Sequence, residues 1–409
     1  MHGAQADVAE LELPAVVEGL VVVFRTGRAV DVDRRAGRGG EPAVAGYVVG
    51  MVVGLEYVLD VDPRIARELQ VPRDLEAGVD HGRDAGVLVA HEVRRAAEVV
   101  VDDLPEDHRA SIIRSDLPVD AFRTPDDRFA DLPGYPFEPH YAEVGGLRLH
   151  YVDEGSGSPV VCFHGEPSWS YLYRKMVPPL VEGGHRVICP DYAGFGRSDK
   201  PIEREWYSYD GHVELMTELL EGLDVRDATV VVQDWGGPIG LRWAVENPDR
   251  VARLVILNTG LFTGRVSKGF LAWRDFAVRN PDLPVGFVIQ GATTAELPDE
   301  ITAAYEAPFP DAHSKAGAAQ FPLLVPTTEE AVGAAEMKAV LDELSRWEKP
   351  ALVAFSDSDP VFPYPRSGEV FSDLIPGAGE QVKIEGAAHF LQEDRGEEIA
   401  ERVLEFPAA

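Results

Sequence analysis

Residues 228–237 read ATVVVQDWGG, a short apolar run followed by an acid, a tryptophan and two glycines. The run from Ala228 to Val232 is rich in β-branched residues, which predicts a buried strand. Pro238, directly after the glycines, suits the first turn of a helix. The stretch therefore predicts a sharp turn from a strand to a helix, with the carboxylate of Asp234 at its apex.

This turn has the composition of a nucleophile elbow, in which small residues surround a reactive side chain. The usual residue at the apex is serine, whereas here it is Asp234. Glycines permit the strained backbone of such a turn, and the positive end of the following helix favours an ionised carboxylate. An aspartate before two glycines can also be a simple helix N-cap, so the assignment depends on the rest of the chain.

Short apolar runs of the same kind recur from Phe122 to the end of the chain and alternate with amphipathic stretches. The runs are LRLHYVDEG, PVVCFHG, HRVICPD, ATVVVQD, RLVILNT, PALVAFS and QVKIEG. They lack strict alternation, which is typical of a mostly parallel sheet covered by helices on both faces. The predicted fold class is therefore α/β.

Two further motifs follow the elbow in the order nucleophile, acid, histidine. The motif SDSDP at 356–360 directly follows the run PALVAF, and GAAHF at 386–390 directly follows QVKIE. An acid and a histidine after successive late strands predict a catalytic triad of Asp234, Asp359 and His389. Asp357, two residues before Asp359, is the alternative triad acid.

A fourth motif, HGEP at 164–167, ends the run PVVCF. An oxyanion hole takes one backbone N–H from such a loop and one from the residue after the nucleophile. These are the amides of Glu166 and Trp235. His164 is expected to fix the loop, because His389 already occupies the position of the base.

The sheet pattern is interrupted once, by residues 261–347, which contain helical segments and several proline turns. We interpret them as a helical cap inserted after the sixth core strand, over the edge of the sheet where open α/β folds bind ligands. The core then comprises residues 118–260 and 348–409. Residues 1–117 carry no motif that demands a chemistry, and they are interpreted as a segment of unknown function, either poorly ordered or the product of a mis-assigned start codon.

The chain is strongly acidic, since 70 Asp and Glu residues against 38 Lys and Arg residues give a formal net charge of −32. Such a charge disfavours nucleic acid and anionic membrane surfaces as partners. Lysine is scarce, and the first one is Lys175. The acid excess is similar to that of cytoplasmic proteins from extreme halophiles, in which salt screens the repulsion between carboxylates.

Cys162 and Cys189 both lie within apolar runs, so we expect buried, reduced thiols. The chain opens on no secretory leader pattern, and no apolar stretch is long enough to span a membrane. We therefore expect a cytoplasmic protein, either a monomer or a small homo-oligomer, with no membrane or nucleic-acid partner.

From about Pro118 to its end the chain resembles haloalkane dehalogenases, in particular the subfamily with an Asp-His-Asp triad and two halide-binding tryptophans. The matching stretches extend over core and cap and include FRTPDDRFADLPGYPFEPHY, HGEPSWSYLYRKM, PDYAGFGRSDKP, VVQDWGG, GFLAW, EAPFPD, AGAAQFP and GAAHFLQED. The resemblance implies the α/β-hydrolase fold, with Trp235 and the cap residue Trp273 as halide ligands. It also implies a substrate pocket walled by Phe270, Pro322, Val325, Val361 and Phe362.

The implied reaction has two steps and uses a halogenated apolar substrate and water. Asp234 displaces halide from carbon to form an alkyl ester, and His389, oriented by Asp359, then activates water against that ester. No metal and no organic cofactor is required. The pocket departs from the family pattern at Pro238, where a bulky residue could stand, and in the poorly matching cap stretch 278–297.

Two other functions compete with this interpretation. An epoxide hydrolase shares the aspartate elbow but uses cap tyrosines to protonate the epoxide oxygen, and Tyr305 keeps that alternative open. A non-catalytic ligand-binding member of the fold is the second alternative, because a fold does not determine a function. Proteins of that kind commonly lack a triad member, whereas none is missing here.

Overall fold

The computed structural model describes residues 20–26, 47–52, 55–61 and 119–407. The chain divides into two compact units, Met1–Ser115 and Asp116–Ala409. In the first unit, strands β1 (Leu20–Thr26), β2 (Tyr47–Val52) and β3 (Leu55–Val61) form an antiparallel sheet in the order β1-β3-β2. Apart from these strands, the predicted segment 1–117 lies outside the described residues.

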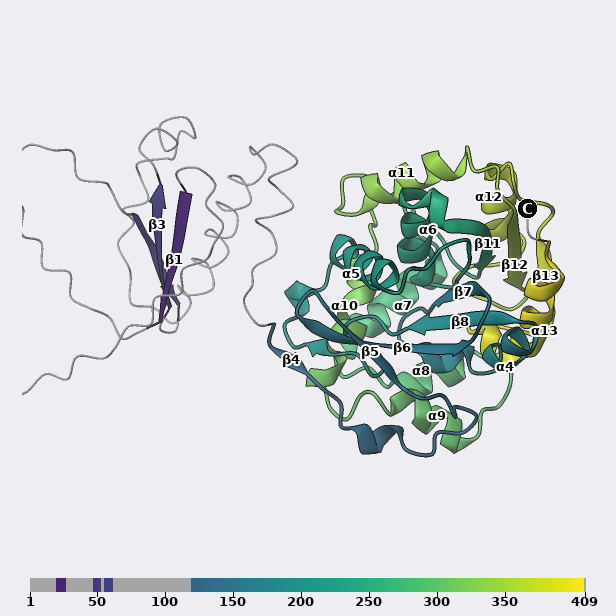
Figure 1. Ribbon diagram of the computed structural model, residues 1–409, viewed down its shortest axis with the longest axis horizontal. Helices are drawn as coiled ribbons and strands as arrows, with labels where there is room; N and C mark the ends of the chain where they lie inside the picture. The colour runs from purple at the N-terminus through teal and green to yellow at the C-terminus, as the bar shows by residue number, and fades with distance from the viewer. Residues whose placement is uncertain (1–19, 27–46, 53–54, 62–118, 408–409) are drawn as a thin grey trace, which may run out of the picture. The chain divides into compact units, whose positions relative to one another are not determined.

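The second unit is built on an eight-stranded sheet in the order β13-β12-β11-β10-β7-β8-β6-β5 (Figure 1). Its strands are β5 (His140–Val144), β6 (Leu147–Gly155), β7 (Ser158–Phe163), β8 (His185–Pro190), β10 (Ala228–Val232), β11 (Val251–Leu257), β12 (Ala351–Ser356) and β13 (Val382–Ile384). Only the pairs β5–β6 and β6–β8 are antiparallel, and the other neighbours are parallel. The predicted α/β class is confirmed, and each of the seven apolar runs contains one strand of this sheet.

Helices cover both faces of the sheet, as the sequence predicts. Helices α4 (Val177–Glu182) and α13 (Leu391–Glu405) pack together, while α5 (Tyr209–Gly222) and α6 (Gly236–Glu246) form a second group on the other side (Figure 1). Helix α12 (Arg366–Leu374) packs against β12. All five residues of the central strand β10 are buried, as expected for a parallel strand with a covered surface on each side.

The insertion between β11 and β12 contains five helices. They are α7 (Lys268–Arg279), α8 (Val285–Gly291), α9 (Asp299–Glu306), α10 (Ala316–Leu324) and α11 (Ala334–Leu344). The side chain of Ser267 accepts a hydrogen bond from the N–H of Phe270 and so determines where α7 begins. Helix α8 packs on α9 and α7 on α10, whereas α11 packs on α6 of the core.

The remaining elements are short. The two-residue strands β4 (Ala121–Phe122) and β9 (Lys200–Pro201) pair with each other. The 3-10 helices are η1 (Asp126–Phe129), η2 (Ser170–Tyr173), η3 (Arg204–Trp206), η4 (Pro248–Arg250) and η5 (His313–Lys315). Cys162 and Cys189 are free and buried, as predicted. Among the described residues, no helix combines the length and the apolar character needed to cross a membrane.

Candidate active site

The predicted elbow lies between β10 and α6, with Asp234 at its apex. Asp234 has a φ of 50°, a left-handed conformation that residues other than glycine rarely adopt. A Cβ atom at Gly236 would lie 2.1 Å from the carbonyl oxygen of Phe163, so a side chain there would collide with the end of β7. The strained turn thus brings the carboxylate to the carboxyl edge of the sheet, where β7 and β10 both end.

The segment after β13 brings His389 to the same edge. Its Nδ1 lies 2.9 Å from Oδ2 of Asp359, whose side chain is fully buried. The other oxygen of Asp359 accepts hydrogen bonds from the N–H groups of Val361, at 2.7 Å, and Phe362, at 3.1 Å. Asp357 instead is exposed and accepts from the N–H of Gly386, so Asp359 is the acid in contact with the histidine.

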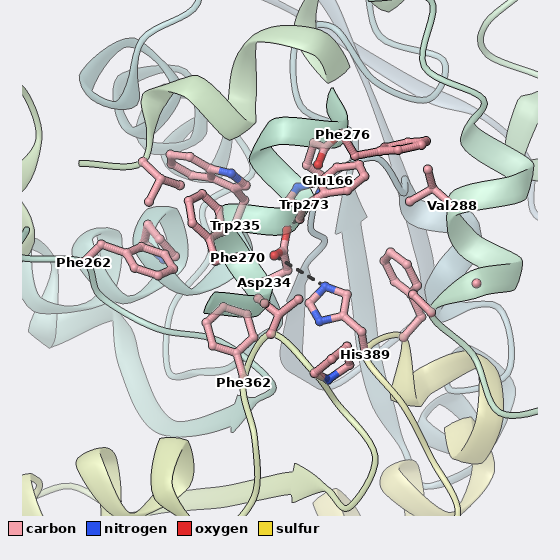
Figure 2. Close-up of a pocket in the computed structure, with 18 of the residues that line it drawn as sticks. Glu166, Asp234, Trp235, Phe262, Phe270, Trp273, Phe276, Val288, Phe362 and His389 are labelled. Atoms are coloured by element: carbon pink, nitrogen blue, oxygen red, sulfur yellow. Dashed lines mark hydrogen bonds and ion pairs between the residues drawn. The ribbon is translucent and has the colours of Figure 1, made fainter. Parts of the chain in front are cut away.

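On the opposite side of the ring, His389 faces the elbow carboxylate (Figure 2). Its Nε2 lies 3.5 Å from Oδ2 of Asp234. Burial by itself lowers the pKa of His389, but the charge of Asp359 and the hydrogen bonds to Asp234 and Asp359 outweigh this effect and raise the pKa to about 10. The resting site therefore favours an imidazolium between two carboxylates.

The loop after β7 contacts the other oxygen of the elbow carboxylate. The backbone N–H of Glu166 donates to Oδ1 of Asp234 at 2.8 Å. His164 fixes this loop, because its Nδ1 lies 2.8 Å from the carbonyl oxygen of Gly165 and its Nε2 accepts from the N–H of Tyr192 at 3.2 Å. Both ring nitrogens of His164 are thus engaged with the backbone, and Oδ2 of Asp234 is the oxygen left toward the cavity and His389.

A cavity of about 260 Å³ opens above the elbow, bounded by the cap (Figure 2). Asp234, Trp235, His389 and Trp273 line it together. Four of the five predicted pocket residues also line it, namely Phe270, Val325, Val361 and Phe362. Pro322 does not, because it is buried within α10, and the chain reaches the cavity only at Val325, after that helix ends.

Trp235 and Trp273 approach the cavity from different parts of the fold. Trp235 follows Asp234 directly at the start of α6, and Trp273 lies in the middle of α7 in the cap. Within the described part of the chain, neither indole N–H donates a hydrogen bond to a protein acceptor. Two N–H donors are therefore available at a cavity whose wall is mostly apolar apart from Glu166, Asp234 and His389. Such donors suit an anion that leaves from carbon.

Sequence reasoning missed part of the cavity wall. Phe262, Phe276, Phe287 and Val288 also line it. Pro238, which the sequence marked as a departure in the pocket, lines it beside the elbow. Phe276 lies three residues after Trp273 on α7, so helical spacing could have identified it. Phe262 and Phe287 carry no comparable local signal, because a loop and a separate cap helix bring them to the cavity.

The side chain of Glu166 is a second feature that was not anticipated. It lines the cavity, and its Oε1 is buried without a hydrogen-bond partner among the described residues. Burial, reinforced by the negative charge of Asp234, raises the pKa of Glu166 well above its ordinary value of 4.5. The protonated form is therefore favoured, which limits the repulsion of Asp234. No cluster of three or more metal-ligating side chains occurs in the described ranges.

Comparisons with known proteins agree on one family. A family model described as the alpha/beta hydrolase fold matches residues 158–396. A haloalkane dehalogenase of Psychrobacter cryohalolentis is 48% identical over 295 residues, covering 69% of this chain and 97% of the relative. One from Mycobacterium marinum is 47% identical over 296 residues, covering 70% and 99%.

Solved structures lead to the same family. A tetrameric haloalkane dehalogenase from Paraglaciecola agarilytica is 37% identical and superposes with a TM-score of 0.66, covering 69% of this chain and 97% of that one. The residues matched by the family model and the elbow both lie in the second unit. The chain therefore belongs to the haloalkane dehalogenase family of the α/β hydrolases.

Proposed function

We propose that this protein hydrolyses carbon–halogen bonds of haloalkanes to give a primary alcohol, a halide ion and a proton. One observation carries the proposal. A carboxylate at the apex of a strained turn, a histidine paired with a second carboxylate, and two unpartnered indole N–H groups all meet at one apolar cavity. This combination supplies a nucleophile, a base and a binding site for the leaving halide.

In the first step, Oδ2 of Asp234 attacks the carbon that bears the halogen, opposite to the carbon–halogen bond. The carbon–oxygen bond forms as the carbon–halogen bond breaks, and the halide leaves with the bonding electron pair toward the N–H groups of Trp235 and Trp273. No proton is transferred in this step, because the attacking group is a carboxylate and not a hydroxyl or a thiol. The bond from Glu166 N to Oδ1 orients the carboxylate for this attack.

In the second step, His389 removes a proton from water as the water oxygen attacks the carbonyl carbon of the ester. Ester formation has by then removed the negative charge of Asp234, one of the groups that raise the pKa of His389. The imidazolium consequently loses its proton more easily at the stage at which a base is needed. The N–H groups of Glu166 and Trp235 stabilise the oxyanion, and its collapse releases the alcohol and restores Asp234.

The geometry gives little support to the epoxide hydrolase alternative. Such an enzyme needs an acidic hydroxyl directed into the cavity. Tyr305 is fully buried, donates its hydroxyl hydrogen to Oε2 of Glu393 at 2.7 Å, and is not among the residues that line the cavity. Its hydroxyl therefore forms a hydrogen bond between the cap and the core.

Halide release and isotope incorporation test this function. With 1,2-dibromoethane and 1-bromobutane at high KCl, we expect bromide release and little diol from an epoxide assayed in parallel. In a single turnover in ¹⁸O-water, the label should enter the carboxylate of Asp234, because water attacks the ester carbonyl and the alcohol keeps an oxygen of the protein. Diol without bromide would favour the epoxide hydrolase, and no product in either assay would favour a binding protein.

For the assembly and the compartment we infer a cytoplasmic monomer or small homo-oligomer. The free, buried thiols of Cys162 and Cys189 are typical of a reducing compartment. A tetramer like that of the relative from Paraglaciecola agarilytica falls within this range. Light scattering during gel filtration, at low and at high salt, tests the oligomeric state.

A further inference from the structure

The backbone that carries His389 is a short segment between β13 and α13. From the sheet side, the carbonyl oxygen of Ala388 accepts hydrogen bonds from Oγ of Ser356, at 2.8 Å, and from Nδ2 of Asn258, at 2.9 Å. These bonds hold the peptide group that joins Ala388 to His389. The N–H of Ala388 belongs to the preceding peptide group and needs a separate partner.

That partner is Asp394, in the first turns of α13. Oδ2 of Asp394 accepts from the N–H of Ala388 at 2.9 Å. The same carboxylate accepts from two backbone N–H groups of the cap loop between α8 and α9. Thr294 donates to Oδ1 at 3.0 Å and to Oδ2 at 3.1 Å, and Ala295 donates to Oδ1 at 3.0 Å. One side chain therefore connects the cap to the residue before His389.

Further bonds join the same two segments. The N–H of Phe390 donates to the carbonyl oxygen of Ala292 at 3.2 Å, and Oγ1 of Thr294 donates to the carbonyl oxygen of Gly386 at 2.8 Å. Ala292 and Phe390 both line the cavity. The cap loop that Asp394 binds thus continues into the cavity wall at Ala292. The core segment that it binds contains the proposed base, His389.

The donors to Asp394 in this arrangement are all backbone N–H groups, so the site requires a side chain that only accepts. A carboxylate meets this requirement, whereas an asparagine of the same size would direct its NH₂ group at one of the donors. Loss of the acceptor would leave the Ala388 N–H without its partner and would release the cap loop.

We propose that Asp394 is a positioning residue that aligns His389 for ester hydrolysis and couples this alignment to the cap wall of the cavity. The proposal rests on the function proposed above. It assigns Asp394 no contact with substrate. Its effect belongs to the second step, because that step needs His389 correctly placed toward water, whereas attack by Asp234 needs no base.

The variants Asp394→Asn and Asp394→Ala test this role, with Glu397→Ala as a matched control. Glu397 is an exposed acid on the same helix, and its side chain makes no hydrogen bond or ion pair within the described part of the chain. The adjacent Glu393 accepts from Tyr305 of α9, and the Asp394 substitutions do not remove this contact between cap and core. Circular dichroism and quenching of tryptophan fluorescence by bromide verify the fold and the halide site of each variant.

Rapid-quench bromide release, steady-state kcat and mass spectrometry of the quenched protein provide the readouts. We expect Asp394→Asn to keep the first-turnover burst of bromide. Its kcat should fall roughly 10- to 100-fold, the range for a misplaced catalytic group. The alkyl ester should accumulate on the protein. Glu397→Ala should match the wild type. If Asp394→Ala does not fold, the nearly isosteric Asp394→Asn variant alone tests the positioning role.

Two results would overturn the proposal, and they differ from failure of the function itself. Unchanged kcat without ester accumulation in a folded Asp394→Asn variant would refute the positioning role. A lower melting temperature with wild-type kcat would show that Asp394 stabilises the fold but does not position His389. If the wild-type protein itself releases no bromide, the proposed function fails first.

Discussion

We predict that Asp359→Asn slows turnover at least about 30-fold while the first halide is released at the wild-type rate. Asp359 contacts Nδ1 of His389 at 2.9 Å and is fully buried, so its charge acts on the ring with little screening by water. In the proposed mechanism, attack by Asp234 needs no base, whereas hydrolysis of the ester requires His389 to accept a proton. The variant should therefore accumulate the ester.

The magnitude follows from the pKa of His389, which the two carboxylates raise from 6.5 to about 10 against the effect of burial. At about 1.36 kcal/mol per pKa unit, the site stabilises the imidazolium by roughly 5 kcal/mol. In the proposed mechanism Asp234 is esterified during hydrolysis, whereas the charge of Asp359, the largest of the raising causes, remains. If Asp359 supplies about 2 kcal/mol of the stabilisation, its loss corresponds to about 30-fold in rate. An asparagine amide can also donate to Nδ1 and place the ring proton on Nε2, so this value is a lower bound.

Rapid-quench measurement of bromide from 1,2-dibromoethane, with mass spectrometry of the protein, separates the two steps. Asp357→Asn is the comparison, since that acid is exposed and its carboxylate accepts from the hydroxyl of Ser358 and the N–H of Gly386, away from His389. We expect it to change kcat less than about threefold. A kcat for Asp359→Asn within threefold of the wild type, or a larger loss for Asp357→Asn, would refute the reasoning.

Four further predictions concern the same site and the boundary of the second unit. Asp234→Ala should abolish turnover while the protein keeps its fold, and normal bromide release would exclude Asp234 as the nucleophile. His389→Gln should release about one bromide per site and then stall, as measured by rapid quench; continued turnover would contradict the two-step scheme. Trp273→Phe should weaken bromide binding roughly 10-fold, because a hydrogen bond to a charged group contributes about 1.5 kcal/mol or more; fluorescence quenching measures this, and an unchanged affinity would make Trp273 a packing residue. A shortened chain beginning near Ile113 should fold and keep the wild-type kcat, and insoluble expression would show that the first unit supports the second.

The sequence alone predicts the sheet because its signals are local. A short apolar run reflects burial on both faces of a strand, and each of the seven quoted runs contains a strand of the sheet. The elbow, the acid loop and the histidine loop each follow such a run directly, so their order along the chain already places them at one edge of the sheet. Strand β5 was missed, because HYAEV carries polar residues and pairs at the border of the sheet.

Other features depend on contacts between segments that lie far apart in the chain. Two aspartates at 357 and 359 are equivalent in a pattern, and only the folded loop directs Asp359 to His389 and Asp357 to Gly386. Pro322 and Phe287 are both apolar cap residues, yet the packing of the cap helices excludes the first from the cavity and admits the second. The sequence by itself thus determined the fold, the order of the motifs and the residue types of the site. The tertiary structure decided which residues share the cavity and how Asp394 links the cap to His389, because these contacts depend on side-chain direction and helix packing, which no local pattern encodes.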